Sequence, residues 1–137
     1  MEPDQDRNEG GFVSLSTRLE RGDVLSAACP SREVLRNVTS RWGTLVLLAL
    51  TTGTLRFSDL RRRATGISEK MLAQTLQTLE ADGFVLRTAY PTVPPKVEYT
   101  LTPLGQEVAS RVGGIADWIE SNIATILRSR ERLRDAP

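Results

Sequence analysis

The sequence predicts a mainly α fold with a small β wing (α+β), and three observations support this prediction. A short helix, a tight turn and a second capped helix follow one another over residues 57–82. Apolar and polar side chains then alternate through residues 84–101, which is the period of a strand. Beyond them, apolar residues recur at steps of three and four over residues 103–128, which is the period of a helix.

Composition excludes several classes of function. The 137 residues contain no histidine and one cysteine, so the most common general base, an internal disulfide and a multi-thiolate zinc site are all absent. We therefore expect no enzyme activity, no metal and no cofactor. No apolar run reaches the roughly 18 residues that span a membrane, and we expect a cytoplasmic protein.

Charge is distributed unevenly along the chain. Residues 1–28 contain six acidic residues and three arginines, whereas the rest contains 15 basic and 11 acidic residues. Basic residues are densest in the segment that holds the two short helices: Arg56, Arg61, Arg62, Arg63 and Lys70. A local cationic patch on a nearly neutral protein is typical of a surface that binds a polyanion, although an ordinary solvated face gives the same pattern.

Residues 1–26 are predicted to form a polar tail, in which the spacing of Leu15 and Leu19 suggests a short helix near residues 13–25. One folded domain is predicted over residues 27–102. Its first helix begins at Pro30, which suits a first helical position. A second, almost wholly apolar helix is predicted from residue 43 or 44 to Leu50, and the short extended segment that follows at residues 55–57 is predicted to be a minor strand beside the wing.

The next two helices have clear local signals. Ser58 is a suitable N-cap for the first, and Thr65-Gly66 forms the turn between them. Ser68 is predicted to cap the second helix, and Gly83 suits the left-handed position after its end. The apolar face of that helix contains Leu72, Leu76 and Leu79, and its opposite face contains Lys70, Gln74, Gln77 and Thr78.

A two-strand hairpin follows over residues 84–101. Three prolines between residues 91 and 95 stiffen its tip and leave few backbone donors there. Helix, turn, helix and hairpin in this order are the layout of a winged helix-turn-helix, which presents a polar helix and a hairpin to DNA.

Thr102-Pro103 begins the last helix, and residues 103–128 are predicted to mediate dimerisation, with a flexible end at 129–137. Its apolar stripe is too long to stay exposed, because each exposed aliphatic side chain forgoes roughly 1.5–3 kcal/mol. A two-fold partner would cover the stripe, although it could also fold back as ordinary core. The predicted interface residues on this helix are Val108, Val112, Ile115, Trp118, Ile119 and Ile123.

Several stretches also match one family pattern. They are Cys29-Pro30, Arg41-Trp42, RFSDLRR at 56–62, GISEKML at 66–72, LEADG at 79–83 and YPTVPPKVEYTLT at 90–102. Over about residues 29–120 the chain thus resembles the HxlR-type transcriptional regulators, a bacterial winged helix-turn-helix family. It departs from the frequent Gly-Gly-Lys of the family at Thr39-Ser40-Arg41.

The resemblance implies a homodimer whose interface is built by the first and last helices, which adds Val34 to the predicted interface. The implied dimer binds an inverted-repeat operator in double-stranded DNA, and we expect a repressor. It also implies that a small molecule or an oxidant could act as effector, since some members of the family sense oxidants through a cysteine at the position of Cys29. From the residues alone, Cys29 is equally well explained as a small, partly buried apolar residue.

The predicted DNA contacts divide into two groups. Lys70, Met71, Gln74 and Thr75 are predicted to carry recognition, while Ser68, Arg62 and Lys96 position the DNA backbone. Each has a simpler interpretation: Met71 can pack, the polar residues can be solvated, and Lys96 can form a cross-strand charge pair. Two other functions stay open, namely a winged-helix module that binds protein without DNA, and a thiol enzyme that uses Cys29.

Overall fold

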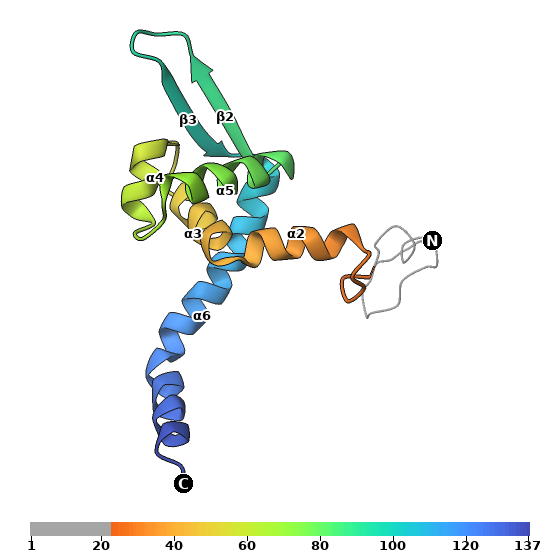
Figure 1. Cartoon of the computed structure of the whole chain (residues 1–137), viewed down its shortest axis with the longest axis vertical. Helices are drawn as coiled ribbons and strands as arrows, with labels where there is room; N and C mark the ends of the chain where they lie inside the picture. Colours follow the sequence, from red (N-terminus) through yellow and green to blue (C-terminus); the bar gives the residue numbers. More distant parts are fainter. Residues whose placement is uncertain (1–22) are drawn as a thin grey trace. The chain divides into compact units, whose positions relative to one another are not determined.

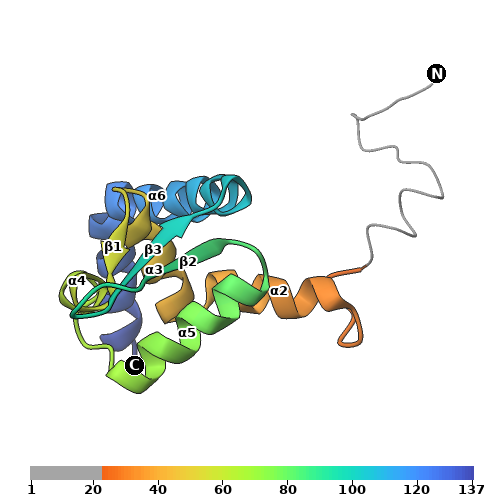
Figure 2. The ribbon, with the colours of Figure 1, turned by 90° about the horizontal axis from the view of Figure 1, so that it is seen from above.

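The computed structural model describes residues 23–137 and is mostly helical with one small antiparallel sheet. The chain divides into two compact units after Arg36. The elements, labelled in Figure 1 except for β1, which Figure 2 labels, are α2 (Pro30–Thr39), α3 (Arg41–Leu50), β1 (Leu55–Arg56), α4 (Phe57–Arg63), α5 (Glu69–Ala81), β2 (Val85–Tyr90), β3 (Lys96–Leu101) and α6 (Pro103–Arg134). The helix expected near residues 13–25 lies outside the described residues, except for residues 23–25, which are not helical.

The starts of the first two described helices have clear local signals. Helix α2 begins at Pro30, as predicted. Helix α3 begins at Arg41 rather than at residue 43 or 44, because Ser40 caps it: the backbone N–H of Gly43 donates to Ser40 Oγ at 3.1 Å. The first turn of α3 is therefore polar, and its apolar part starts one turn later.

The start of α4 differs from the prediction. Ser58 is not its N-cap, because the helix begins at Phe57 directly after β1. Leu55 and Arg56 pair with Tyr99 and Glu98 of β3, which keeps the backbone extended up to Arg56. The N–H of Arg56 then donates to Asp59 Oδ2 at 3.3 Å, so strand pairing fixes where the helix starts.

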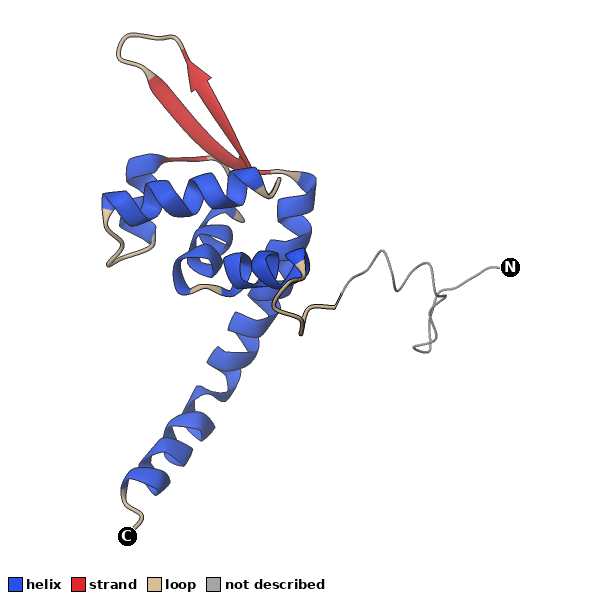
Figure 3. Cartoon of the chain, turned by 45° about the vertical axis from the view of Figure 1, so that its right-hand side comes forward, coloured by secondary structure: helices blue, strands red, loops and turns tan. Residues whose placement is uncertain are grey.

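The sheet has the strand order β1-β3-β2, and all pairs are antiparallel. The short extended segment predicted at residues 55–57 is thus a strand of the same sheet as the hairpin. One face of the sheet covers the core with Val85, Tyr99 and Leu101. The free end of the β2–β3 hairpin extends beyond the helices of its unit (Figure 3).

The core of residues 37–137 lies around α3, which packs on α5 and α6. Aliphatic side chains from three helices fill it and are almost completely buried: Val46, Leu47, Leu50, Leu60, Leu72, Leu76 and Leu79. Figure 2 shows α5 at the edge of this unit, with α3 on its inner side. One face of α5 therefore packs and the other is left to solvent.

Helix α6 joins this core only through its first turns. Thr102 Oγ1 caps it by accepting the N–H of Gly105 at 2.9 Å. A β-carbon at Gly105 would lie 1.9 Å from the carbonyl oxygen of Phe84, so only glycine allows this close approach. The helix runs to Arg134 rather than ending near residue 128, and Gly113-Gly114 does not interrupt it.

Beyond Gly113, no residue of α6 is buried. This half of the helix extends away from the other helices of its unit (Figure 3). Across residues 23–137, no helix combines the length and the apolar character that a membrane span requires.

Candidate nucleic-acid interface

The turn between α4 and α5 sets the direction of α5. Gly66 lies within it at φ +96°, a backbone conformation that favours glycine. Two residues later, Ser68 Oγ accepts the N–H of Met71 at 3.1 Å and caps α5 as predicted. Ile67 and Leu72, on either side of this cap, are both buried, and they anchor the start of α5 in the core.

Helix α5 has two distinct faces. Leu72, Leu76 and Leu79 are buried on the inner face. The outer face contains all four predicted recognition residues, of which Lys70, Met71 and Gln74 are exposed and Thr75 is half-buried. Met71 keeps 40% of its surface exposed, so it does not pack into the core.

A shallow hollow of about 210 Å³ lies beside the outer face of α5. Its lining consists of Asn37, Ser40, Met71, Gln74, Thr75, Thr78 and Leu79. Asn37 is fixed there because its Nδ2 donates to Asp82 Oδ2 at 2.8 Å. The sequence-based site omits Asn37, Ser40 and Thr78. The sequence signal for Asn37 and Ser40 was the capping serine itself. Ser40 marks where α2 ends and α3 begins, and this junction lies beside α5.

A second, wider hollow of about 710 Å³ lies at the N-terminal end of α5. It is lined by Ser58, Arg61, Arg62, Thr65, Gly66, Ile67 and Ser68. This hollow brings two predicted backbone contacts, Arg62 and Ser68, to one place. Two arginines, a helix N-terminus and hydroxyl groups are the chemistry that binds phosphate.

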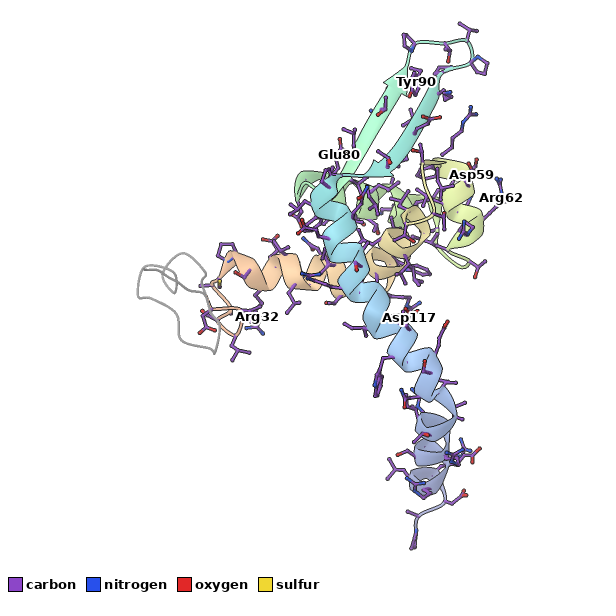
Figure 4. All side chains as sticks on the ribbon, turned by 180° about the vertical axis from the view of Figure 1, so that it is seen from behind. Arg32, Asp59, Arg62, Glu80, Tyr90 and Asp117 are labelled. Carbon is purple, nitrogen blue, oxygen red and sulfur yellow. The ribbon has the colours of Figure 1, made fainter. Side chains whose placement is uncertain are left out.

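Both arginines of this hollow already have carboxylate partners. Arg62 Nη2 donates to Asp59 Oδ1, and Figure 4 shows the two side chains on α4. Arg61 Nη1 donates to Glu69 Oε2 at 2.9 Å and so links α4 to the first residue of α5. The third arginine, Arg63, donates to Thr52 Oγ1 at 3.4 Å. Two of the three arginines of α4 are therefore held by carboxylates.

Lys96 lies at the base of the hairpin tip and is also paired. Its Nζ lies 3.5 Å from Glu98 Oε2 and 4.7 Å from the ring centroid of Tyr90, its cross-strand neighbour. The hydroxyl of Tyr90 donates to Glu98 Oε1 at 3.2 Å. That hydrogen bond and the charge of Glu98 raise the pKa of Tyr90. The cross-strand charge pair expected as the simpler interpretation of Lys96 is not the one formed, because its acidic partner Glu98 lies two residues further along the same strand.

The hairpin tip itself carries no charge. Residues 91–95 read Pro-Thr-Val-Pro-Pro, and the side chain of Val93 is fully exposed. Thr92 Oγ1 donates to the carbonyl oxygen of Pro94 at 2.8 Å within the tip. The tip thus presents an apolar surface, and the charges of the hairpin lie behind it.

Comparisons with known proteins identify the family. A family model described as HxlR-like helix-turn-helix matches residues 37–126, which is more than half of the chain. The HTH-type transcriptional regulator YtfH of Escherichia coli K12 is 60% identical over 119 residues, covering 87% of this chain and 94% of that protein. The chain belongs to the HxlR-like helix-turn-helix family of transcriptional regulators.

Solved structures agree with this family assignment. A YtfH transcriptional regulator from Salmonella typhimurium is 61% identical, with a TM-score of 0.77 over 80% of this chain and 98% of that one. The redox regulator HypR in its oxidized form is 38% identical, with a TM-score of 0.63 over 69% of this chain and 97% of that one. The winged-helix arrangement with a long C-terminal helix is thus that of known HxlR-like regulators.

Cys29 of this HxlR-like chain lies directly before α2 and is partly exposed. Its Sγ accepts the N–H of Asp23 at 3.3 Å and lies 3.3 Å from Ser31 Oγ. The hydrogen bond with the Ser31 side chain is the main cause that lowers the pKa of the thiol. A lowered pKa favours the thiolate, which is the reactive form.

The predicted interface residues differ in exposure. Ile115, Trp118, Ile119 and Ile123 are exposed along one side of α6, together with Leu127. Val112, in contrast, is 6% exposed and already belongs to the core of its own unit, so it has little surface left for a partner. Val108 and Val34 are half-buried.

Metal binding has no support in the part of the chain that the structure describes. Within residues 23–137, no three or more aspartate, glutamate or cysteine side chains are grouped to hold a metal ion.

Proposed function

We propose that this HxlR-like regulator binds operator DNA as a homodimer and represses transcription. The observation that carries the proposal is the outer face of α5, where Lys70, Met71, Gln74 and Thr75 face solvent while the opposite face is anchored in the core. An α-helix held in this way fits the major groove, where such side chains reach the edges of bases.

The residues take different roles in this proposal. Gln74 and Lys70 read base edges, since glutamine pairs with adenine and lysine with guanine. Met71 contacts thymine methyl groups through its exposed thioether. Arg62, Ser68 and Lys96 contact phosphates, with Arg62 and Ser68 in the hollow at the start of α5. These phosphate contacts fix the register and carry no sequence information.

The homodimer follows from the second half of α6. Its exposed apolar side chains recur on one side of the helix at residues 115, 118, 119, 123 and 127, and nothing in residues 37–137 covers them. A second copy would bury this stripe through the same residues on both sides. Two copies of α5 would then contact half-sites about one helical turn, ~34 Å, apart.

An oxidant is the proposed effector, and it acts at Cys29. The lowered pKa of this thiol and the similarity to HypR, a redox regulator, support that role. A peroxide would convert the Cys29 thiolate to a sulfenic acid and would itself become water or an alcohol. Because the chain contains one cysteine, the thiol for the next step must come from outside it. A second thiol, from the other subunit or from a small molecule, would then displace water and form a disulfide.

A footprint on the DNA upstream of its own gene tests the function. We expect one protected segment with an inverted repeat, and an affinity that falls steeply with salt as counterions are released. Lys70→Ala and Gln74→Ala should each weaken binding to that segment by about tenfold or more. Matched controls on the exposed surface of α6, Arg111→Ala and Gln106→Ala, should leave it unchanged.

Three other results would contradict parts of this proposal. No protection of upstream DNA, with a protein captured through the α5 face, would identify a protein-binding module instead. Equal effects of Lys70→Ala and Arg111→Ala would show that only total charge matters. A Cys29→Ser variant that keeps its DNA binding but still releases DNA on oxidation would exclude the proposed sensor.

A further inference from the structure

Three cations of the proposed DNA-binding surface share one property, which is that an acidic side chain of the same surface holds each of them. Arg62 pairs with Asp59, Arg61 with Glu69 and Lys96 with Glu98. These pairs come from three separate elements, α4, the start of α5 and β3. Of the basic residues predicted to contact DNA, Lys70 alone forms no such pair within residues 23–137.

Neither Glu69 nor Glu98 caps a helix, although Glu69 also lies in the first turn of α5, where a negative charge favours the helix dipole. Glu69 is highly exposed, with a side chain that is 72% accessible, and Ser68 rather than Glu69 caps α5. Glu98 lies on the sheet face opposite to the core, where it accepts from Tyr90 and faces Lys96. Asp59 differs, because its Oδ2 also accepts the N–H of Arg56 at the start of α4.

Both carboxylates lie where a DNA phosphate is proposed to bind. Glu69 is the first residue of α5 and contacts an arginine that lines the hollow where phosphate is proposed to bind. Glu98 lies beside the lysine that follows the hairpin tip. A phosphate that approaches either cation must displace the carboxylate from its ion pair or lie close to it. Both cost free energy, because an ion pair is lost in the first case and like charges repel in the second.

We propose that Glu69 and Glu98 are internal competitors of the DNA phosphates, and that they lower the affinity of this protein for every duplex irrespective of sequence. The inference rests on the proposed DNA-binding function. Base contacts by α5 then make up a larger share of the binding free energy, because the part of the affinity that does not depend on sequence is reduced. The carboxylates thus limit occupancy of non-operator DNA without touching a base.

The test measures binding of the full chain to two duplexes, the footprinted upstream segment and a scrambled duplex of about 30 base pairs, at about 0.15 M salt. Glu69→Gln and Glu98→Gln keep the shape of the side chain and remove its charge. Each should tighten binding to both duplexes by about threefold to tenfold and leave their affinity ratio unchanged. Glu107→Gln, an exposed position of α6 with the same change in net charge, is the control and should alter affinity by less than about 1.5-fold.

A double-mutant cycle separates release of the cation from simple loss of negative charge. In an Arg61→Ala background, Glu69→Gln has no guanidinium to release, so its gain in affinity should fall to less than half of its value in the native protein. The same comparison applies to Lys96→Ala with Glu98→Gln. Thermal unfolding of each variant checks that the fold is retained.

Three results would overturn the proposal. Equal gains for Glu69→Gln, Glu98→Gln and Glu107→Gln would show a general effect of net charge. Unchanged or weaker binding of the first two would show that the carboxylates orient the cations toward DNA rather than compete with it. Absence of binding of the native protein to either duplex at low salt would refute the proposed function, and the inference with it.

Discussion

The dimer proposed here leads to a prediction whose size can be worked out from α6. Ile119 keeps 41% of its surface exposed in the single chain. Full burial of an isoleucine contributes about 1.5–3 kcal/mol, so covering the remaining two fifths contributes about 0.6–1.2 kcal/mol per protomer. An aspartate in its place would lose this burial and would also bring a carboxylate against apolar side chains.

The carboxylate adds a cost of at least about 1–3 kcal/mol per copy. Because a two-fold interface contains each substitution twice, Ile119→Asp should destabilise the dimer by about 3–8 kcal/mol in total. That corresponds to an increase of at least about a hundredfold in the Kd of dimerisation.

Sedimentation velocity over a range of protein concentrations measures this Kd. The control is Ser121→Asp, which introduces the same charge at an exposed position two residues further along α6 and therefore on another side of the helix. We expect the control to remain a dimer and to bind upstream DNA, and Ile119→Asp to be monomeric and to bind weakly. If Ile119→Asp retains the native Kd, or if both variants dissociate equally, the α6 stripe is not the interface.

Three further predictions concern the elements that position the site. Ser68→Ala should lower the free energy of unfolding by about 1 kcal/mol through loss of the α5 cap. Urea denaturation measures this change, and the control is Ser110→Ala, which removes a serine of α6 that caps no helix. Gly66→Ala should cost about 1–2 kcal/mol in the same assay, and the cost should come from the backbone alone because the added β-carbon would meet only Trp42 Cη2, at an ordinary 3.6 Å. Ser31→Ala should shift the pH midpoint of Cys29 alkylation upward, because it removes the main cause of the lowered thiol pKa; an unchanged midpoint would show that Ser31 does not stabilise the thiolate.

Elements with strong local signals could be predicted from the sequence. The Ser68 cap and Gly83 delimit α5 as expected, and Thr102-Pro103 begins α6. The starts of α3 and α4 were misplaced for different reasons. Ser40 is a cap that local chemistry could have shown, whereas the start of α4 depends on pairing between β1 and β3. That pairing joins residues 55–56 to residues 98–99, and local chemistry does not show at which residue the strand ends and the helix starts.

The candidate site shows the same division. Helical periodicity alone placed Lys70, Met71 and Gln74 on the outer face of α5, since it requires only that the leucines face inward. The partners of the cations were not predictable in the same way. Arg61 reaches Glu69 only because the turn at Gly66 brings the end of α4 to the start of α5. Such a contact depends on backbone angles that the spacing of residues does not specify.

The net negative charge of α5, together with the ion pairs around it, gives a physical reason for the proposed dimer. Its 13 residues contain one lysine and two glutamates, so the helix proposed to enter the major groove is itself slightly acidic. Attraction to phosphate must then come from its neighbours, and there Asp59, Glu69 and Glu98 hold Arg62, Arg61 and Lys96. A single DNA-binding unit of this kind would bind weakly. Two units joined through α6 would multiply their weak contacts at an inverted repeat, because the second binds at a high effective concentration. At DNA with one half-site that gain is lost, so weak single contacts make the dimer a condition for operator binding.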